Sequence, residues 1–102
     1  MEIPSRFKIG GQTFQIKLLD QVNNGDSYGD FSYCPAEIRL ATKYEDNGLK
    51  EIPHNQMLNN FWHEVFHAFN YMWNTETDES LAQTFANFMC EYEDSKDYGK
   101  EN

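Results

Sequence analysis

Two histidines and a glutamate stand close together in an otherwise apolar run, at His63, Glu64 and His67. A spacing of four residues brings both imidazoles to the same side of a helix, one turn apart. Imidazoles placed in this way match two corners of a tetrahedral zinc site. Glu64 lies next to the first histidine and can reach a metal-bound water without binding the metal itself. The spacing therefore predicts two zinc ligands and a general base on a single helix.

A catalytic zinc ion needs a third protein ligand as well as an open position. We expect Glu79 to be that ligand, because it falls in the first turn of the next predicted helix, on a side whose small residues allow close approach. Glu79 can also be read as a carboxylate favoured by a helix N-terminus. His54 is a poorer ligand candidate, since it lies at or before the start of the first helix. Gln83, one turn after Glu79, is expected to hydrogen-bond a ligand histidine and to fix its orientation.

This pattern resembles that of the gluzincin metallopeptidases, which carry H-E-x-x-H on one helix and a glutamate ligand on the next. The matching residues are 63–67 and 79–83, and Gln83 departs from the aspartate that is usual in the family. Size and element order look most similar to the minigluzincins and to compact phage or bacterial metallopeptidase-like proteins. The resemblance implies a zinc cofactor, a peptide or protein substrate, and hydrolysis by a zinc-bound water that Glu64 activates as the general base. It also implies that an edge strand within 30–42 aligns the substrate backbone.

The donor that would stabilise the oxyanion of such a reaction stays open. The candidates are four tyrosines: Tyr28, Tyr33, Tyr71 and Tyr98. Without such a donor, zinc and Glu64 would support weak activity only. Two other readings therefore stay open, a zinc-binding protein-interaction module derived from a metallopeptidase, and a latent peptidase whose acidic tail covers the cleft.

The first half of the chain predicts strands. Apolar and polar residues alternate on both sides of Gly10-Gly11, which predicts a hairpin within 6–20. A second hairpin is expected from strands near 30–33 and 37–42, with Pro35 at its turn. Residues 43–53 read as a polar connection. The resulting three or four strands need a helix to cover their apolar face.

The second half predicts two helices, over about 55–73 and 78–92. The first helix has an apolar stripe that should pack on the sheet, made of Leu58, Phe61, Trp62, Val65, Phe69 and Met72. The two histidines lie on the opposite side of this helix. The second helix has a stripe of large apolar residues, made of Leu81, Phe85, Phe88 and Tyr92. This stripe lies apart from the side with small residues, which can approach the first helix. The sequence thus predicts one small α+β, zincin-like domain over 1–102, with a sheet packed on the active-site helix, then a glutamate helix and a flexible tail at 93–102.

Composition limits the partners. The formal charge of −9 makes nucleic acid an unfavourable partner, because phosphate binding needs clustered Lys and Arg. No apolar run is long enough for a membrane span. The two cysteines, Cys34 and Cys90, are fewer than a small secreted domain usually carries, so we expect reduced thiols and a cytoplasmic location.

Overall fold

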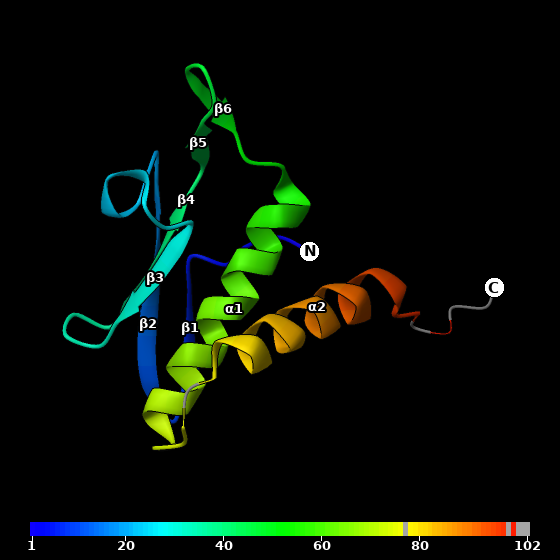
Figure 1. Cartoon of the computed structure of the whole chain (residues 1–102). Coiled ribbons are helices and arrows are strands. Elements are labelled where there is room, and N and C mark those ends of the chain that lie inside the picture. Colours follow the sequence, from blue (N-terminus) through cyan, green and yellow to red (C-terminus); the bar gives the residue numbers. More distant parts are fainter. Residues whose placement is uncertain (77, 98, 100–102) are drawn as a thin grey trace.

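The structure is a computed structural model that describes residues 1–76, 78–97 and 99. One face of a four-stranded sheet packs against a long helix, and a second helix crosses that helix on its other side (Figure 1). The elements in chain order are β1 (Arg6–Ile9), β2 (Gln12–Leu19), a short 3-10 helix (Asn23–Gly25), β3 (Gly29–Ser32), β4 (Glu37–Ala41), β5 (Lys43–Glu45), β6 (Leu49–Glu51), α1 (His54–Met72) and α2 (Glu79–Ser95). The predicted α+β class, the order of its elements and both helices are therefore confirmed.

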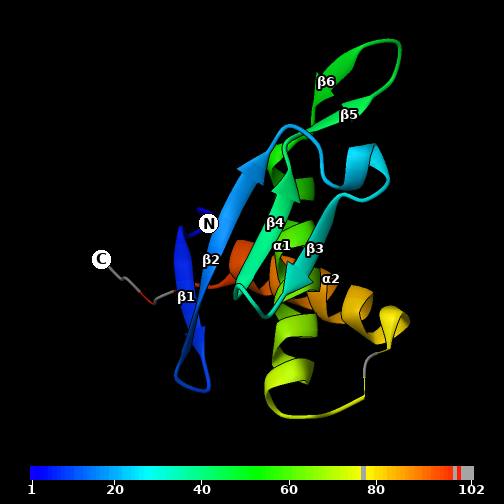
Figure 2. The same ribbon diagram turned by 90° about the vertical axis from the view of Figure 1, so that its left-hand side faces the viewer.

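Both predicted hairpins are present in the main sheet. β1 pairs antiparallel with β2 across Gly10 and Gly11, whose φ angles of 59° and 83° suit residues without a side chain. β3 pairs antiparallel with β4, and β2 joins β4 in parallel, so the strand order is β1-β2-β4-β3. This order leaves β3 as an edge strand beside α1 (Figure 2).

The core lies between the sheet and α1. Phe14, Ile38 and Leu40 are fully buried on the inner face of the sheet, and Phe61 of α1 is 2% exposed against it. Phe69 contradicts the predicted stripe, because its side chain is 43% exposed and Ala68 is buried instead. The buried face of α1 is centred on Phe61, Glu64 and Ala68, to one side of the predicted stripe. Phe69 therefore lies at its margin and lines an open apolar groove beside the β1–β2 turn.

Residues 43–51 form a second, two-stranded sheet rather than the predicted polar connection. β5 and β6 pair antiparallel around Asn47 and Gly48, whose φ angles of 57° and 109° identify a turn that Asn-Gly favours. The hairpin projects beyond the main sheet (Figure 1). Its side chains are mostly polar, so the sequence lacks the apolar–polar alternation that marks a half-buried strand. The Asn-Gly pair, however, is typical of a hairpin turn and could have indicated one.

α2 packs on α1 through the predicted small residues and also through Phe85, a member of the large apolar stripe whose ring lies 5.1 Å from that of Phe66. Ala82 and Ala86 are fully buried, whereas Leu81 and Phe88 of the large apolar stripe are more than half exposed. α2 continues to Ser95, so the segment 93–102 is helical in its first three residues. Residues 98 and 100–102 of that segment lie outside the described part of the chain. Neither helix combines the length and the hydropathy needed to cross a membrane.

Candidate metal centre

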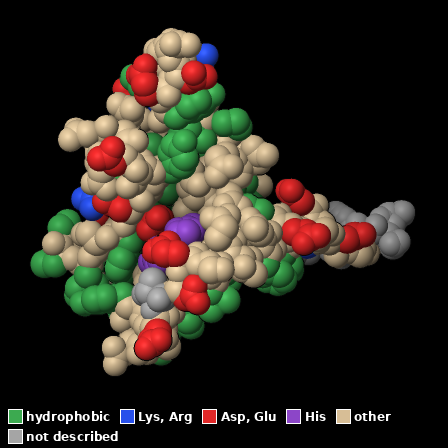
Figure 3. All heavy atoms as spheres, in the orientation of Figure 1, with side chains coloured by type: hydrophobic (Ala, Val, Ile, Leu, Met, Phe, Trp, Pro, Cys, Tyr) green, Lys and Arg blue, Asp and Glu red, His purple; other side chains and the backbone are tan. Residues whose placement is uncertain are grey.

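A cleft of about 990 Å³ opens between the edge strand β3, α1 and the first turns of α2. His63, Glu64 and His67 reach it from α1, and Glu79 reaches it from α2. Figure 3 shows histidine side chains among carboxylates where the two helices meet. The cleft thus contains all four residues that the sequence predicts to bind zinc or activate water.

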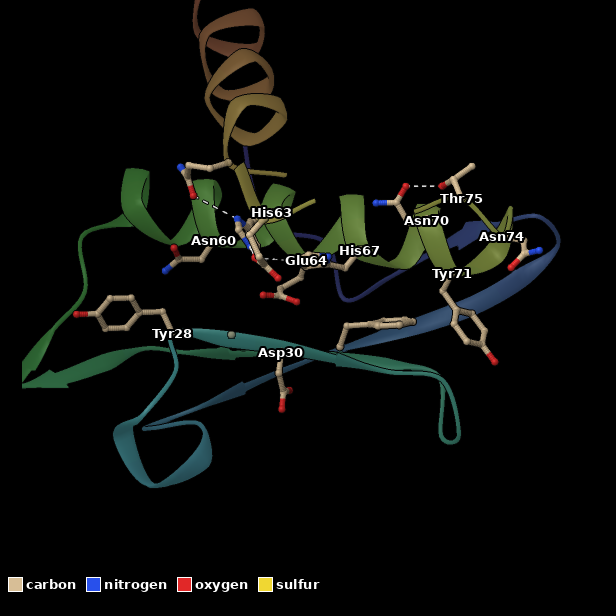
Figure 4. A pocket seen from close by; sticks show the side chains of 14 residues that line it. Tyr28, Asp30, Asn60, His63, Glu64, His67, Asn70, Tyr71, Asn74 and Thr75 are labelled. Atoms are coloured by element: carbon tan, nitrogen blue, oxygen red, sulfur yellow. Dashed lines mark hydrogen bonds and ion pairs between the residues drawn. The ribbon is translucent and has the colours of Figure 1, made fainter. Parts of the chain in front are cut away.

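The two histidines and Glu79 bring their ligand atoms together. The Nε2 atoms of His63 and His67 lie 3.0 and 3.3 Å from the same Glu79 carboxylate oxygen, Oε1. One potential ligand atom from each residue lies within 4.8 Å of the others. Figure 4 shows His63 and His67 as neighbours on α1. Imidazole nitrogen and carboxylate oxygen are both ordinary zinc ligands, so these three side chains fit a zinc ion chemically. Their role as ligands stays a prediction.

The start of α2 positions Glu79. Asp78 caps the helix, because its side chain accepts hydrogen bonds from the backbone N–H groups of Ser80 and Leu81 at 2.9 and 3.2 Å. The capping role is thus taken by Asp78, which leaves the Glu79 carboxylate free to face the histidines. Partial burial raises the pKa of the Glu79 carboxyl, but hydrogen bonds and charge from His63 and His67 outweigh burial and hold this pKa below its ordinary value.

An amide network behind His63 fixes the orientation of its ring. The Gln83 side-chain NH₂ donates to the Oδ1 atoms of Asn59 and Asn87 at 2.7 and 3.0 Å. Asn59 in turn donates to Asn87 Oδ1 at 2.9 Å. With its NH₂ engaged twice, Gln83 keeps its oxygen as an acceptor, 3.2 Å from His63 Nδ1. The tautomer that carries its proton on Nδ1 satisfies this contact and leaves Nε2 as the ligand atom.

The tautomer of His63 determines whether its Nε2 atom donates to Glu79 or faces it with a lone pair. If Nδ1 carries the only ring proton, the lone pair of His63 Nε2 points at Glu79 Oε1, which is also an acceptor. Two acceptors at 3.0 Å need a cation between or beside them, either a proton or a metal ion. The contact geometry therefore matches a site prepared for a cation. Asn59 and Asn87 were missed from the sequence, although each stands one helical turn from a predicted site residue.

Replacing Gln83 with alanine should weaken zinc binding by roughly 10–100-fold, the range seen for partners that orient ligand histidines. The loss follows because His63 would keep its nitrogen ligand but lose the acceptor that fixes the ring and the tautomer. Competition with a chromogenic chelator measures the zinc affinity, and Glu91→Ala, an exposed position on the same helix, is the matched control. Equal zinc affinity in both variants would show that the amide network does not orient the ligand.

Glu64 occupies a different environment from Glu79. Its side chain is buried, and Figure 4 shows it directed between α1 and β3. A Cβ atom on Gly29 would stand 3.3 Å from Glu64 Cγ and 3.2 Å from the Arg39 carbonyl oxygen, so glycine permits the strand to approach this closely. Burial raises the pKa of the Glu64 carboxyl to about 7. A carboxyl with a pKa near neutrality is suited to accept and return a proton.

The hydroxyl groups of the cleft tyrosines do not face the histidine pair. Tyr28 and Tyr71 line the cleft, but Figure 4 shows both hydroxyl groups directed away from the histidine pair. Tyr33 packs its ring on that of Tyr71 at 4.7 Å, and Tyr98 lies outside the described residues. Sequence reasoning overlooked two other cleft donors, the side-chain amides of Asn60 and Asn70. Their Nδ2 atoms are buried without a hydrogen-bond partner among the described residues.

The remaining candidates lie away from the cleft. His54 begins α1 and its Nε2 is hydrogen-bonded to the Met1 carbonyl oxygen at 2.9 Å, so its exclusion as a ligand agrees with the structure. Cys34 and Cys90 are free thiols. Neither cysteine lines the cleft.

No protein-family model, curated protein or solved structure matches this chain. The H-E-x-x-H motif and the geometry of the cleft are the features of the chain that bear on its function.

Proposed function

We propose that the protein is a zinc-dependent metallopeptidase of gluzincin type on a minimal zincin-like fold. The observation that carries this proposal is the convergence of His63, His67 and Glu79 on one point beside a buried glutamate, Glu64. Zinc, when bound, would supply Lewis-acid polarisation and lower the pKa of a coordinated water. The free thiols agree with a cytoplasmic location, which we propose with the function.

Glu64 is the proton carrier of the proposed reaction. Its carboxylate takes a proton from the water whose oxygen attacks the peptide carbonyl carbon, and it returns this proton to the amine as the C–N bond breaks. In the metal-free protein burial raises the pKa of this carboxyl to about 7, and a cation bound by the neighbouring side chains would lower it towards the carboxylate form that accepts a proton. The burial that sets this pKa depends on the close approach of β3 at Gly29.

The open edge of β3 is suited to hold an extended peptide. The Ala41 N–H donates to the Tyr28 carbonyl oxygen at 2.9 Å, so this pair is hydrogen-bonded in the β3–β4 ladder. Alternation then turns the backbone groups of Gly29 and Phe31 away from β4, towards the open edge. Both residues line the cleft. A substrate strand can therefore pair with β3 while its carbonyl faces the histidine pair.

The proposal is tested by comparing wild type with Glu64→Gln. We expect both proteins to contain one zinc ion per chain by elemental analysis, and only the wild type to cleave an unfolded protein or peptide mixture, as read by mass spectrometry. Glutamine keeps the shape of Glu64 but cannot accept the proton. Wild type that binds no zinc, or cleavage that is unchanged in Glu64→Gln, would refute the proposal.

One observation favours a second function, a zinc-binding protein-interaction module without catalysis. The hydroxyl groups of both cleft tyrosines point away from the histidines, which leaves an oxyanion without a tyrosine donor among the described residues. Such a module predicts zinc in wild type and Glu64→Gln alike, peptide binding by both, and cleavage by neither.

A further inference from the structure

We propose that Phe31, Tyr33 and Tyr71 form a specificity subsite, the aromatic wall, for a large apolar or aromatic side chain two residues before the scissile bond. The inference names the substrate class of the cleft and rests on the proposed peptidase function. Its basis is the position, packing and exposure of these three rings.

The position follows from two elements that run side by side. Gly29 on β3 lies next to Glu64 on α1, which places the reacting centre at that level of the cleft. Phe31 is two residues further along β3, about 7 Å away. Tyr71 is two helical turns beyond Glu64, on the same face of α1, and its ring lies 5.7 Å from that of Phe31. The aromatic wall therefore stands about two substrate residues from the reacting centre.

The rings form a pre-assembled and accessible surface. Tyr71 packs between Phe31 at 5.7 Å and Tyr33 at 4.7 Å, measured between ring centroids. Phe31 is held in place on its core side, because its ring centroid lies 5.7 Å from that of Phe14, a fully buried core residue. Tyr71 and Tyr33 nevertheless stay 54% and 41% exposed. Exposed rings that are already ordered can bury apolar surface of a ligand with little loss of conformational freedom.

The opposite end of the cleft has a different chemistry. Tyr28 lies there and contacts no other ring among the described residues, and the neighbouring cleft residue Asn60 is a polar amide. An extended peptide would therefore meet a continuous aromatic surface on one side of the reacting centre only. Antiparallel pairing with β3, the commoner arrangement of neighbouring strands, puts the N-terminal half of the peptide at the aromatic wall.

The test uses two peptides that are identical except for phenylalanine or alanine two residues before the mapped cleavage site. We expect wild type to favour the phenylalanine peptide about 10-fold in kcat/KM, with the difference in KM. Tyr71→Ala should bring the ratio close to one, and Tyr71→Phe should keep it, since the ring and not the hydroxyl makes the contact. Tyr92→Ala removes a similarly exposed tyrosine of α2 and is the control that should keep the full preference.

A binding measurement separates this proposal from the proposed function. Fluorescence anisotropy reports the affinity of zinc-loaded Glu64→Gln for both peptides, with and without Tyr71→Ala. Suppose that wild type cleaves neither peptide, but zinc-loaded Glu64→Gln binds the phenylalanine peptide more tightly than the alanine peptide and loses this preference with Tyr71→Ala. The peptidase function is then wrong and the subsite is right. Cleavage without a preference, a preference that survives Tyr71→Ala, or a preference two residues after the scissile bond would overturn the subsite. Absence of both cleavage and selective binding would overturn both.

Discussion

Glu79→Ala is expected to lower the affinity of the protein for zinc by more than the roughly 100-fold that marks the loss of an orienting partner. Glu79 contributes the only carboxylate among the three converging ligand atoms, and it is the only one of the three that comes from α2. Its loss would leave two imidazoles on a single helical face, which is too few protein ligands for a stable zinc site.

Unfolding in the presence of zinc gives a direct measure of this loss. A ligand that binds only the folded protein at 100 times its Kd adds about 2.7 kcal/mol to the free energy of unfolding. At the same zinc concentration, a variant with a 100-fold weaker site gains only about 0.4 kcal/mol. Urea titration with and without zinc, on wild type and Glu79→Ala, distinguishes these gains.

Glu76→Ala is the matched control, because it removes the same charge from an exposed position in the loop just before α2. It should keep the wild-type gain from zinc. If Glu79→Ala also keeps the full gain, Glu79 is not a ligand, and its contact with the histidines is an ordinary ion pair.

The local parts of the site could be predicted from the sequence. A spacing of four residues places His63 and His67 on one helical face, whatever the helix packs against. The small residues Ala82 and Ala86 indicated the side of α2 that approaches α1, and Glu79 shares that side. Hairpins around Gly10-Gly11 and Pro35 followed from turn chemistry in the same way.

The parts that depend on long-range packing could not be predicted. The burial of Glu64 arises where Gly29 of β3 approaches α1, a contact between residues far apart in the chain. Asn59 and Asn87 look like ordinary helix-surface amides until α2 is docked on α1. Residue types indicated Gln83 as a partner of a histidine, but only the paired helices show what fixes its amide. The amides that hold Gln83 cannot be found from sequence spacing, because their hydrogen-bond partners lie on another helix.

Glu64→Gln is also expected to stabilise the metal-free protein at pH 8 by roughly 3 kcal/mol relative to wild type, and to leave stability nearly unchanged at pH 4. The pKa of Glu64 is raised from 4.5 to about 7, mainly by burial; His63 opposes the shift, and the charges of Asp30 and Glu79 add to it. Between these two pKa values the folded protein holds a proton that the unfolded chain has released, so the stability of wild type falls as pH rises through this window. Glutamine has no charge to bury and escapes the fall.

Urea denaturation of wild type and Glu64→Gln in chelator, at several pH values from 4 to 8, measures this difference. Titrations elsewhere in the chain occur in both proteins and cancel in the comparison, and Glu91→Gln provides an exposed control that should follow wild type throughout. A gain of roughly 3 kcal/mol is a large part of the 5–15 kcal/mol typical of small domains, so it is readily measured. A gap between the two proteins that is constant with pH would mean that Glu64 is not held in a desolvated site. A base kept there at the expense of stability is what the proposed proton transfer requires, and a purely structural glutamate would not explain it.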